Sequence, residues 1–426
     1  MKAPRHLEVL GILCIFSVFL DRAIRGVLPF DLYLNYPIFI VFMLAVIAHL
    51  GGLVFPPRWF NWSLAAIFIV SLINLLFTGR LGFEFVKQVF GIVFTSFVYY
   101  NVLYIFKFDI KRIFNYYLKF AYWVAAFGVV DNILHIVGFH LTAVNSAGPF
   151  LYREYSIMGE PFYLAMALTP AVVYYCVFFH RTWQNEKWKF LCILLCYLLT
   201  FSSIALTGLI LGVFFGLYQN QFFSLRSNRL AIVPVLIIPV IFFANSLIQN
   251  VNLYKARFND TFTLFFTTQV KTEEAGKSNA STFALYSNYV IARDSFFEDP
   301  LFGSGLGSHP IIYKETFLKY FPEKYLQMFG NQNQQDANSK LLRLMSETGL
   351  FGTVLFLAAV FGFRLANKYS HSVLEYTAIN NSIFVYIILG LIRNGNYINV
   401  GFFLFFFMYY IAYKNVKQST LSDSRF

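Results

Sequence analysis

Three arginines of this chain stand beside short polar motifs that adjoin apolar segments. Arg153 lies shortly before a Gly-Glu-Pro turn, Arg343 lies in a polar run that leads into an apolar segment, and Arg393 lies just before an Asn-Gly-Asn turn. A planar guanidinium group matches phosphate oxygens with two parallel hydrogen bonds, so all three suit a phosphate or diphosphate group. Each could equally be an anchor that extends its charge from a membrane helix to water.

Three carboxylates accompany these arginines as candidate proton acceptors: Glu160 in the Gly-Glu-Pro turn, and Asp336 and Glu347 on either side of Arg343. A carboxylate within reach of an attacking hydroxyl can take its proton or orient it. The alternatives are structural, since Glu160 could cap a helix before Pro161 and Glu347 could pair with Arg343 four residues earlier. The candidate catalytic residues are therefore Arg153, Glu160, Asp336, Arg343, Glu347 and Arg393.

A glycine-rich run and two further residues are candidate substrate contacts. Gly303 and Gly305 occupy alternate positions of residues 299–307, Asp-Pro-Leu-Phe-Gly-Ser-Gly-Leu-Gly, where backbone N–H groups could cradle a phosphate. The competing interpretation is a tight turn. Asn338 offers an amide near Arg343, and Tyr397 offers a ring on which the apolar face of a sugar could stack.

The apolar composition indicates which kind of secondary structure carries these residues. Of the 426 residues, 58% are hydrophobic and 13% are charged, and the mean hydropathy is +0.60. A soluble domain has roughly 25% charged residues, so the sequence predicts an all-α polytopic membrane protein. The net charge of +12 lies largely in short loops and does not indicate nucleic-acid binding. The four cysteines fall inside apolar segments, where they are expected to pack.

About twelve segments are expected to cross the membrane, although several are shorter than the ~20 residues of an ideal span. The eighth follows the seventh after a tight turn at Ser202 and Ser203. The predicted spans are Leu7–Leu20, Leu32–Phe55, Trp62–Phe77, Phe85–Phe106, Phe114–Val137, Pro161–Phe179, Phe190–Phe201, Ile204–Tyr218, Leu230–Ile248, Leu350–Phe363, Ile379–Ile392 and Phe402–Tyr413.

The positions of the basic residues predict the orientation. If the N-terminus is cytoplasmic, most lysines and arginines of the short loops fall on the cytoplasmic side, as the positive-inside rule requires. Merging the seventh and eighth spans would invert the rest of the chain and remove this bias. Both ends are therefore expected in the cytoplasm and the long polar stretch outside it, where no nucleotide sugar is available.

One long polar stretch, Ile248 to Glu347, interrupts the series of spans. The chain is thus expected to divide into residues 1–248 with nine spans, residues 249–349 as a large outer loop with short helices, and residues 350–426 with three spans and a cytoplasmic tail. Helices are expected at 282–297 and after Asp336 or Asn338, either of which could cap the second one. That second helix would enter the tenth span through Gly349.

In their order and spacing these motifs resemble the bacterial O-antigen polymerase and O-antigen ligase superfamily. The resemblance covers most of the chain from Arg153 onward. It rests on PLFGSGLG, on the later ANSKLLRLMSETGLFG, on Arg153 with Gly159-Glu160-Pro161, on TFSSIALTG near Thr200, and on the run from Arg393 to Tyr397. The ligases place a histidine about nine residues before the glutamate of the E-x-G-x-x-G run, where this chain has Asn338. This departure favours the polymerase branch.

The resemblance implies a membrane glycosyltransferase of GT-C-like architecture that works without a metal or another cofactor. Donor and acceptor would be glycans linked through diphosphate to undecaprenol, at the periplasmic face of a bacterial inner membrane. Membrane lipids and a chain-length regulator protein are further candidate partners. The sequence contains no Asp-x-Asp motif, so arginines would offset the charge on the departing lipid diphosphate.

Three functions are compatible with these features. A polymerase would join lipid-linked repeat units into O-antigen or capsular polysaccharide. A ligase, or a protein O-oligosaccharyltransferase, would move a finished glycan from the same donor onto lipid A core or a protein. A flippase or other transporter would carry lipid-linked glycans without chemistry, but the sequence shows no internal repeat of the kind that many transporters have.

Overall fold

The computed structural model describes residues 4–20, 34–139, 141–142, 146–148, 151–220, 252–265, 272–329, 333–365 and 371–423. Apart from two short strands, the regular elements of these residues are helices, as the sequence predicted. The N-terminal elements are α1 (Arg5–Phe16), the 3-10 turn η1 (Ser17–Phe19), α2 (Asn35–Leu50), α3 (Arg58–Phe77), α4 (Phe83–Ile105) and α5 (Ile110–Ile136).

The middle of the chain begins with an antiparallel pair of strands, β1 (Ser146–Gly148) and β2 (Leu151–Tyr152). The helices that follow are α6 (Pro161–Val177), α7 (Phe179–Asn185), α8 (Lys187–Leu199) and α9 (Ser203–Gln219). The tight turn predicted at Ser202 and Ser203 is confirmed, because α8 ends at Leu199 and α9 begins at Ser203. The predicted span Leu230–Ile248 lies outside the described residues.

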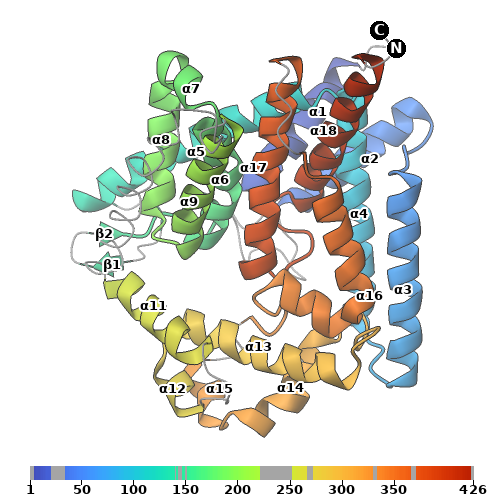
Figure 1. Cartoon of the computed structure of the whole chain (residues 1–426), viewed down its shortest axis with the longest axis vertical. Coiled ribbons are helices and arrows are strands. Elements are labelled where there is room, and N and C mark those ends of the chain that lie inside the picture. The colour runs from blue at the N-terminus through green and yellow to red at the C-terminus, as the bar shows by residue number, and fades with distance from the viewer. Residues whose placement is uncertain are drawn as a thin grey trace.

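The late polar stretch forms a layer of helices across one end of the bundle (Figure 1). Its elements are α11 (Asn252–Phe265), α12 (Thr272–Lys277), α13 (Ala280–Glu298), α14 (His309–Tyr320) and α15 (Lys324–Phe329). The chain then returns to the bundle through α16 (Lys340–Gly362), α17 (His371–Arg393) and α18 (Phe402–Asp423). The start of α1 and the end of α18 lie at the opposite end of the bundle from this layer (Figure 1).

The chain is embedded in a membrane, but the count of about twelve spans is not confirmed. Within the described residues, five helices are long and apolar enough to cross: α3, α4, α5, α16 and the Val373–Arg393 part of α17. Helices α6 and α7 would make a sixth span, with a bend of 95° between them. Apolar helices such as α2 and α9 fall short of the length that a bilayer requires.

Helix α6 is the centre of the bundle. It is apolar on every side, and nearly all of its residues are buried against α9, α17 and α8. A helix that is hydrophobic all round is stable only when it is surrounded by other helices, which is the position α6 takes. The four cysteines are free thiols on α1, α6 and α8, and Cys14 and Cys196 are fully buried.

Helix α16 has two parts that join at Gly349, as the sequence predicted. Gly349 adopts φ 58° and ψ −153°, a conformation that essentially only glycine tolerates. The cap differs from the prediction, because the Ser339 hydroxyl, and not Asp336 or Asn338, accepts the hydrogen bond from the Leu342 amide. The kink lets residues 299–307 lie against α16, and the Gly305 and Leu350 amides donate to the Glu347 and Pro300 carbonyls across the contact.

Replacing Gly349 by alanine is expected to destabilise the protein by roughly 2–6 kcal/mol, because backbone strain adds to overpacking. A Cβ atom at Gly349 would lie 2.6 Å from the Gly303 nitrogen and 2.7 Å from the Leu301 carbonyl oxygen. Gly362 is the matched control on the same helix, since a Cβ there would meet nothing within 4 Å. Melting temperature in detergent measures both, and a Gly349→Ala protein as stable as Gly362→Ala would contradict this account.

Candidate functional site

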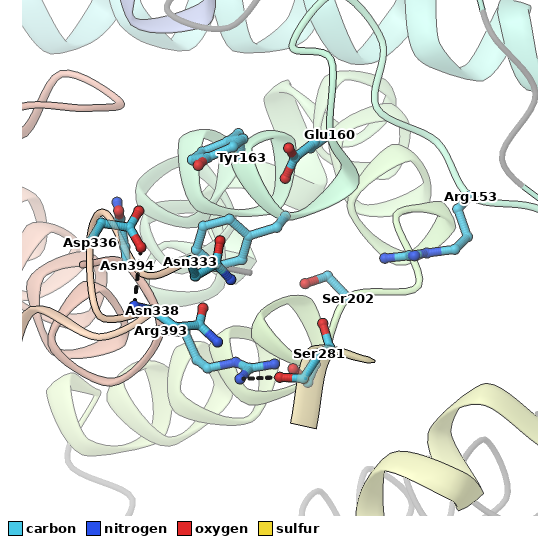
Figure 2. Close-up of a pocket in the computed structure, with 12 residues that line it drawn as sticks. Arg153, Glu160, Tyr163, Ser202, Ser281, Asn333, Asp336, Asn338, Arg393 and Asn394 are labelled. Carbon is cyan, nitrogen blue, oxygen red and sulfur yellow. Dashed lines mark hydrogen bonds between the residues drawn. The ribbon is translucent and has the colours of Figure 1, made fainter. Parts of the chain in front are cut away.

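A pocket with an empty volume of about 570 Å³, its open mouth included, lies where the layer of helices α11 to α15, here called the loop layer, meets the bundle (Figure 2). Five of the residues predicted from the sequence line it, although they come from distant parts of the chain. The lining consists of Arg153, Glu160, Phe162, Tyr163, Ser202, Ser203, Ser281, Asn333, Asp336, Asn338, Arg393 and Asn394.

Among the described helices, four begin at this pocket. Glu160 is the N-cap of α6, Ser202 is the N-cap of α9, and Ser281 lies in the first turn of α13. Asn338 directly precedes Ser339, the N-cap of α16. Helix N-termini carry free N–H groups and partial positive charge, so their convergence favours a bound anion.

Two arginines reach the pocket from opposite sides (Figure 2). Arg153 lies on the connection between β2 and α6, and Arg393 is the last residue of α17. Both side chains are half-buried, and Arg393 Nη1 donates a long hydrogen bond of 3.5 Å to the Ser281 carbonyl. The surrounding protein lowers the dielectric around both guanidinium groups, which strengthens their attraction for an anion.

Two carboxylates complete the charged lining, Glu160 and Asp336, and both are half-buried. Glu160 occupies the N-cap position of α6, as the capping interpretation expected, but its side chain makes no hydrogen bond that caps the helix. Asp336 Oδ1 accepts a hydrogen bond of 3.1 Å from the Asn338 amide, which holds the carboxylate beside the Asn338 side chain at the pocket (Figure 2). The site therefore presents proton acceptors together with cations.

Gly395 allows the two turns that form one wall of the pocket to lie against each other. A Cβ atom at Gly395 would lie 1.3 Å from the Asp336 carbonyl oxygen, so no side chain can be accommodated there without moving the Asp336 turn. This contact aligns the residue 333–338 turn with Arg393 and Asn394. The sequence shows both turns but not their contact, because nearly sixty residues separate them.

Arg343 and Glu347 form a buried ion pair behind that wall and do not line the pocket. Arg343 Nε donates to Glu347 Oε1 at 3.0 Å, and the side chains are 1% and 0% exposed. Tyr397 completes the cluster, since its hydroxyl donates to Glu347 Oε2 at 3.0 Å and its ring lies 4.6 Å from the guanidinium carbon of Arg343. Burial, with the nearby carboxylate, raises the pKa of Tyr397 well above its usual value. The predicted pairing of Arg343 with Glu347 is thus confirmed, and the cluster fastens α16 to the turn after α17.

Gly303 and Gly305 also lie away from the pocket. A Cβ at Gly303 would meet the Gly349 nitrogen at 2.5 Å, and one at Gly305 would meet the Leu75 side chain of α3 at the same distance. Both glycines have positive φ and let residues 299–307 pack against α16 and α3. The structure therefore gives them a packing role, in agreement with the tight-turn interpretation.

His309 is the loop histidine nearest to the E-x-G-x-x-G run, but it is buried and holds three helices together through hydrogen bonds. Its Nε2 donates to Asn288 Oδ1, and its Nδ1 accepts from the Ser346 hydroxyl, each at 2.9 Å. Burial, and then the charge of Arg343, lower the pKa of His309 to about 3. The imidazole is therefore neutral and joins α14 to α13 and α16.

Apart from Asn338, the neutral side chains of the pocket were not predicted as site residues from the sequence. Ser202 and Ser203 were identified only as a turn, and their place at the start of α9 was the available signal. Asn394 was noted only as part of the Asn-Gly-Asn turn, and Tyr163 and Asn333 carried no signal of their own. Among the described residues, no three or more His, Cys, Asp or Glu side chains gather in a way that could hold a metal ion.

Residues 165–357 match the family model described as O-antigen ligase. The chain contains an O-antigen ligase-like domain. This match confirms the resemblance to the O-antigen polymerase and O-antigen ligase superfamily and supports an activity of that general type. No curated protein matches the chain.

The O-antigen ligase-like domain contains only part of the pocket. Ser202, Ser203, Ser281 and the turn from Asn333 to Asn338 fall inside it. The residues that complete the lining from either side lie outside, namely Arg153, Glu160, Phe162, Tyr163, Arg393 and Asn394. Both arginines of the pocket are thus contributed by segments that flank the domain.

Proposed function

We propose that this protein polymerises oligosaccharide repeat units linked through diphosphate to undecaprenol, on the periplasmic face of a bacterial inner membrane. The observation that carries the proposal is the pairing of Arg153 and Arg393 with four helix N-termini in one pocket that also holds two carboxylates. Cations and helix N-termini suit a diphosphate, and carboxylates suit the hydroxyl that replaces it.

The pocket supplies the groups that such a transfer needs. The acceptor hydroxyl oxygen forms a bond to the anomeric carbon of the donor glycan, and the bond between that carbon and the diphosphate oxygen breaks. The hydroxyl proton passes to a carboxylate, Glu160 or Asp336. The lipid diphosphate leaves with the bonding electrons, and Arg153, Arg393 and the α9 N-terminus offset its charge.

The neutral side chains of the pocket suit the sugars. Hydroxyls and amides of Ser203, Ser281, Asn333 and Asn394 can donate to and accept from sugar hydroxyls. Tyr163 and Phe162 add ring surface for the apolar face of a sugar. A site of this composition favours a glycan over a purely lipid ligand.

Asn338 favours a polymerase over a ligase. The residue lines the pocket at the position where the resemblance implies a histidine in ligases. A neutral amide can orient a substrate, but it cannot take up a proton at neutral pH, so proton transfer would depend on the carboxylates. A ligase or protein O-oligosaccharyltransferase remains the alternative enzyme, and a lipid-linked oligosaccharide transporter the alternative of another class.

The orientation supports the periplasmic assignment. The start of α1 and the end of α18 lie at one end of the bundle, and the loop layer with the pocket lies at the other (Figure 1). Combined with the positive-inside rule, this arrangement favours cytoplasmic ends and a periplasmic pocket.

The purified protein in detergent, supplied only with lipid-linked repeat units, tests the proposal. A polymerase converts them into a ladder of longer lipid-linked chains. A ligase requires an added lipid A core or protein acceptor before product forms, and a transporter leaves the units unchanged. A gel of surface polysaccharide from a deletion strain provides the cellular counterpart, in which loss of the polymerase leaves single repeat units.

A further inference from the structure

Arg153 lies on an irregular connection, yet the residues on both sides of it are held firmly. Asn132, a buried residue of α5, donates from Nδ2 to the Tyr152 carbonyl at 3.1 Å. On the other side, the Glu154 amide donates to the Leu199 carbonyl at the end of α8, at 2.9 Å. The backbone that carries Arg153 is thus tied to two helices of the bundle.

The Glu154 side chain strengthens this attachment from inside the bundle, where it is 2% exposed. Its Oε1 accepts from the Ser156 amide at 2.6 Å, and its Oε2 accepts from Asn132 Nδ2 at 3.5 Å. The Ser156 hydroxyl in turn donates to the Val124 carbonyl of α5 at 2.9 Å. Asn132 therefore contacts both neighbours of Arg153.

Gly128, one turn before Asn132, makes room for the carboxylate. A Cβ atom there would lie 3.1 Å from Glu154 Cγ and 2.9 Å from Cys196 Sγ. The side chain of Glu154 is therefore packed tightly between Gly128 of α5 and α8. Such packing determines the position of the connection more strongly than a surface hydrogen bond would.

The Ser156 amide and Asn132 Nδ2 are both hydrogen-bond donors to the Glu154 carboxylate. The ionised carboxylate can accept from both, whereas a protonated carboxyl would direct its own O–H toward a donor. Burial, and then the charge of Asp131, raise the pKa of Glu154 to about 7. The other titratable groups around it are Cys196 on α8, His135 on α5, which pairs with Asp131, and the sequence neighbours Arg153 and Tyr155. Glu154 therefore changes charge near neutral pH within the segment that carries Arg153.

We propose that Asn132 and Glu154 are positioning residues that hold Arg153 in the pocket, and that Glu154 does so in its ionised form. This inference rests on the proposed function, in which Arg153 offsets charge on the leaving lipid diphosphate. A displacement of about 1 Å is enough to lower a rate roughly 100-fold. Weakening the attachment should therefore lower kcat more than it raises KM.

The test measures kcat and KM of the purified protein with lipid-linked repeat units between pH 6 and pH 8. Wild-type kcat is expected to fall about tenfold from pH 8 to pH 6, as one carboxylate with a pKa near 7 becomes protonated. Glu154→Gln is expected to be at least about tenfold slower than wild type at pH 8 and nearly independent of pH. Glu154→Asp should keep the pH dependence, and Glu323→Gln, at an exposed glutamate of the loop layer, should match wild type.

A Glu154→Gln protein with wild-type kcat and the wild-type pH profile would overturn the inference. Asn132→Ala provides a second variant, expected to lower kcat with a melting temperature close to that of wild type. Arg153→Ala separates the two proposals. If Arg153→Ala is inactive while Glu154→Gln and Asn132→Ala behave as wild type, only the positioning role fails. If Arg153→Ala is fully active, the role of Arg153 at the diphosphate fails as well. If the wild-type protein makes no polymer from lipid-linked units, the proposed function itself fails.

Discussion

Alanine in place of Arg393 or Arg153 is expected to slow chain extension roughly 100- to 1,000-fold, while the protein accumulates normally. Both arginines lie at the pocket, and the contact of Arg393 with Ser281 is long, so little folding energy depends on it. Charge develops on the diphosphate as the bond to the sugar breaks, and each guanidinium group stabilises that charge. The ladder of lipid-linked products from purified protein measures the effect, and lysine at either position should recover part of it.

Arg80 is the matched control for these two arginines. It is expected at the same face of the membrane, but it pairs with Glu315 at 2.7 Å, with side chains 27% and 49% exposed. Exposed ion pairs contribute little, about 0–1 kcal/mol, so Arg80→Ala should be fully active. Full-length polymer from both Arg153→Ala and Arg393→Ala would rule out this pocket as the diphosphate site.

Removing either partner of the Arg343–Glu347 pair is expected to destabilise the protein by about 3–5 kcal/mol. The remaining charge would be left buried, since neither side chain is more than 1% exposed. Arg343→Ala and Glu347→Ala should therefore accumulate poorly in membranes and melt at lower temperature in detergent. Replacing both residues by apolar ones of similar volume, Arg343→Met with Glu347→Leu, should recover much of the loss because no charge is left unpaired.

The stability of these variants distinguishes a structural role of Arg343, Glu347 and Tyr397 from a role in the chemistry. The exposed pair Lys319–Asp294 in the loop layer is the control, and its Lys319→Ala variant should be as stable as wild type. If Arg343→Ala were as stable as wild type but inactive, the pair would belong to the chemistry, as the sequence first suggested.

The amino-acid sequence was enough to predict a helical membrane protein, most of its helices and its resemblance to the O-antigen polymerase and O-antigen ligase superfamily. Apolar segments of ten or more residues leave few alternatives to a helix, because lipid cannot satisfy backbone polar groups. The prediction also identified Arg153, Glu160, Asp336, Asn338 and Arg393, which the structure brings to one pocket. All of them except Arg153 stand at the end of a predicted helix, and the helices that face one side of a membrane must end near one another.

Which of the charged residues are accessible depends on long-range packing, and the sequence does not show it. Arg343 and Arg393 look alike in the sequence, since each follows an apolar stretch or leads into one, but the first is buried against Glu347 and the second is half-buried at the pocket. The difference arises from contacts between residues far apart in the chain, such as Gly395 with Asp336 and Gly303 with Gly349. Local spacing cannot specify such contacts, because they depend on how whole helices pack. For the same reason, the hydrogen bonds that tie the β2–α6 connection beside Arg153 to α5 and α8 can be recognised only in the structure.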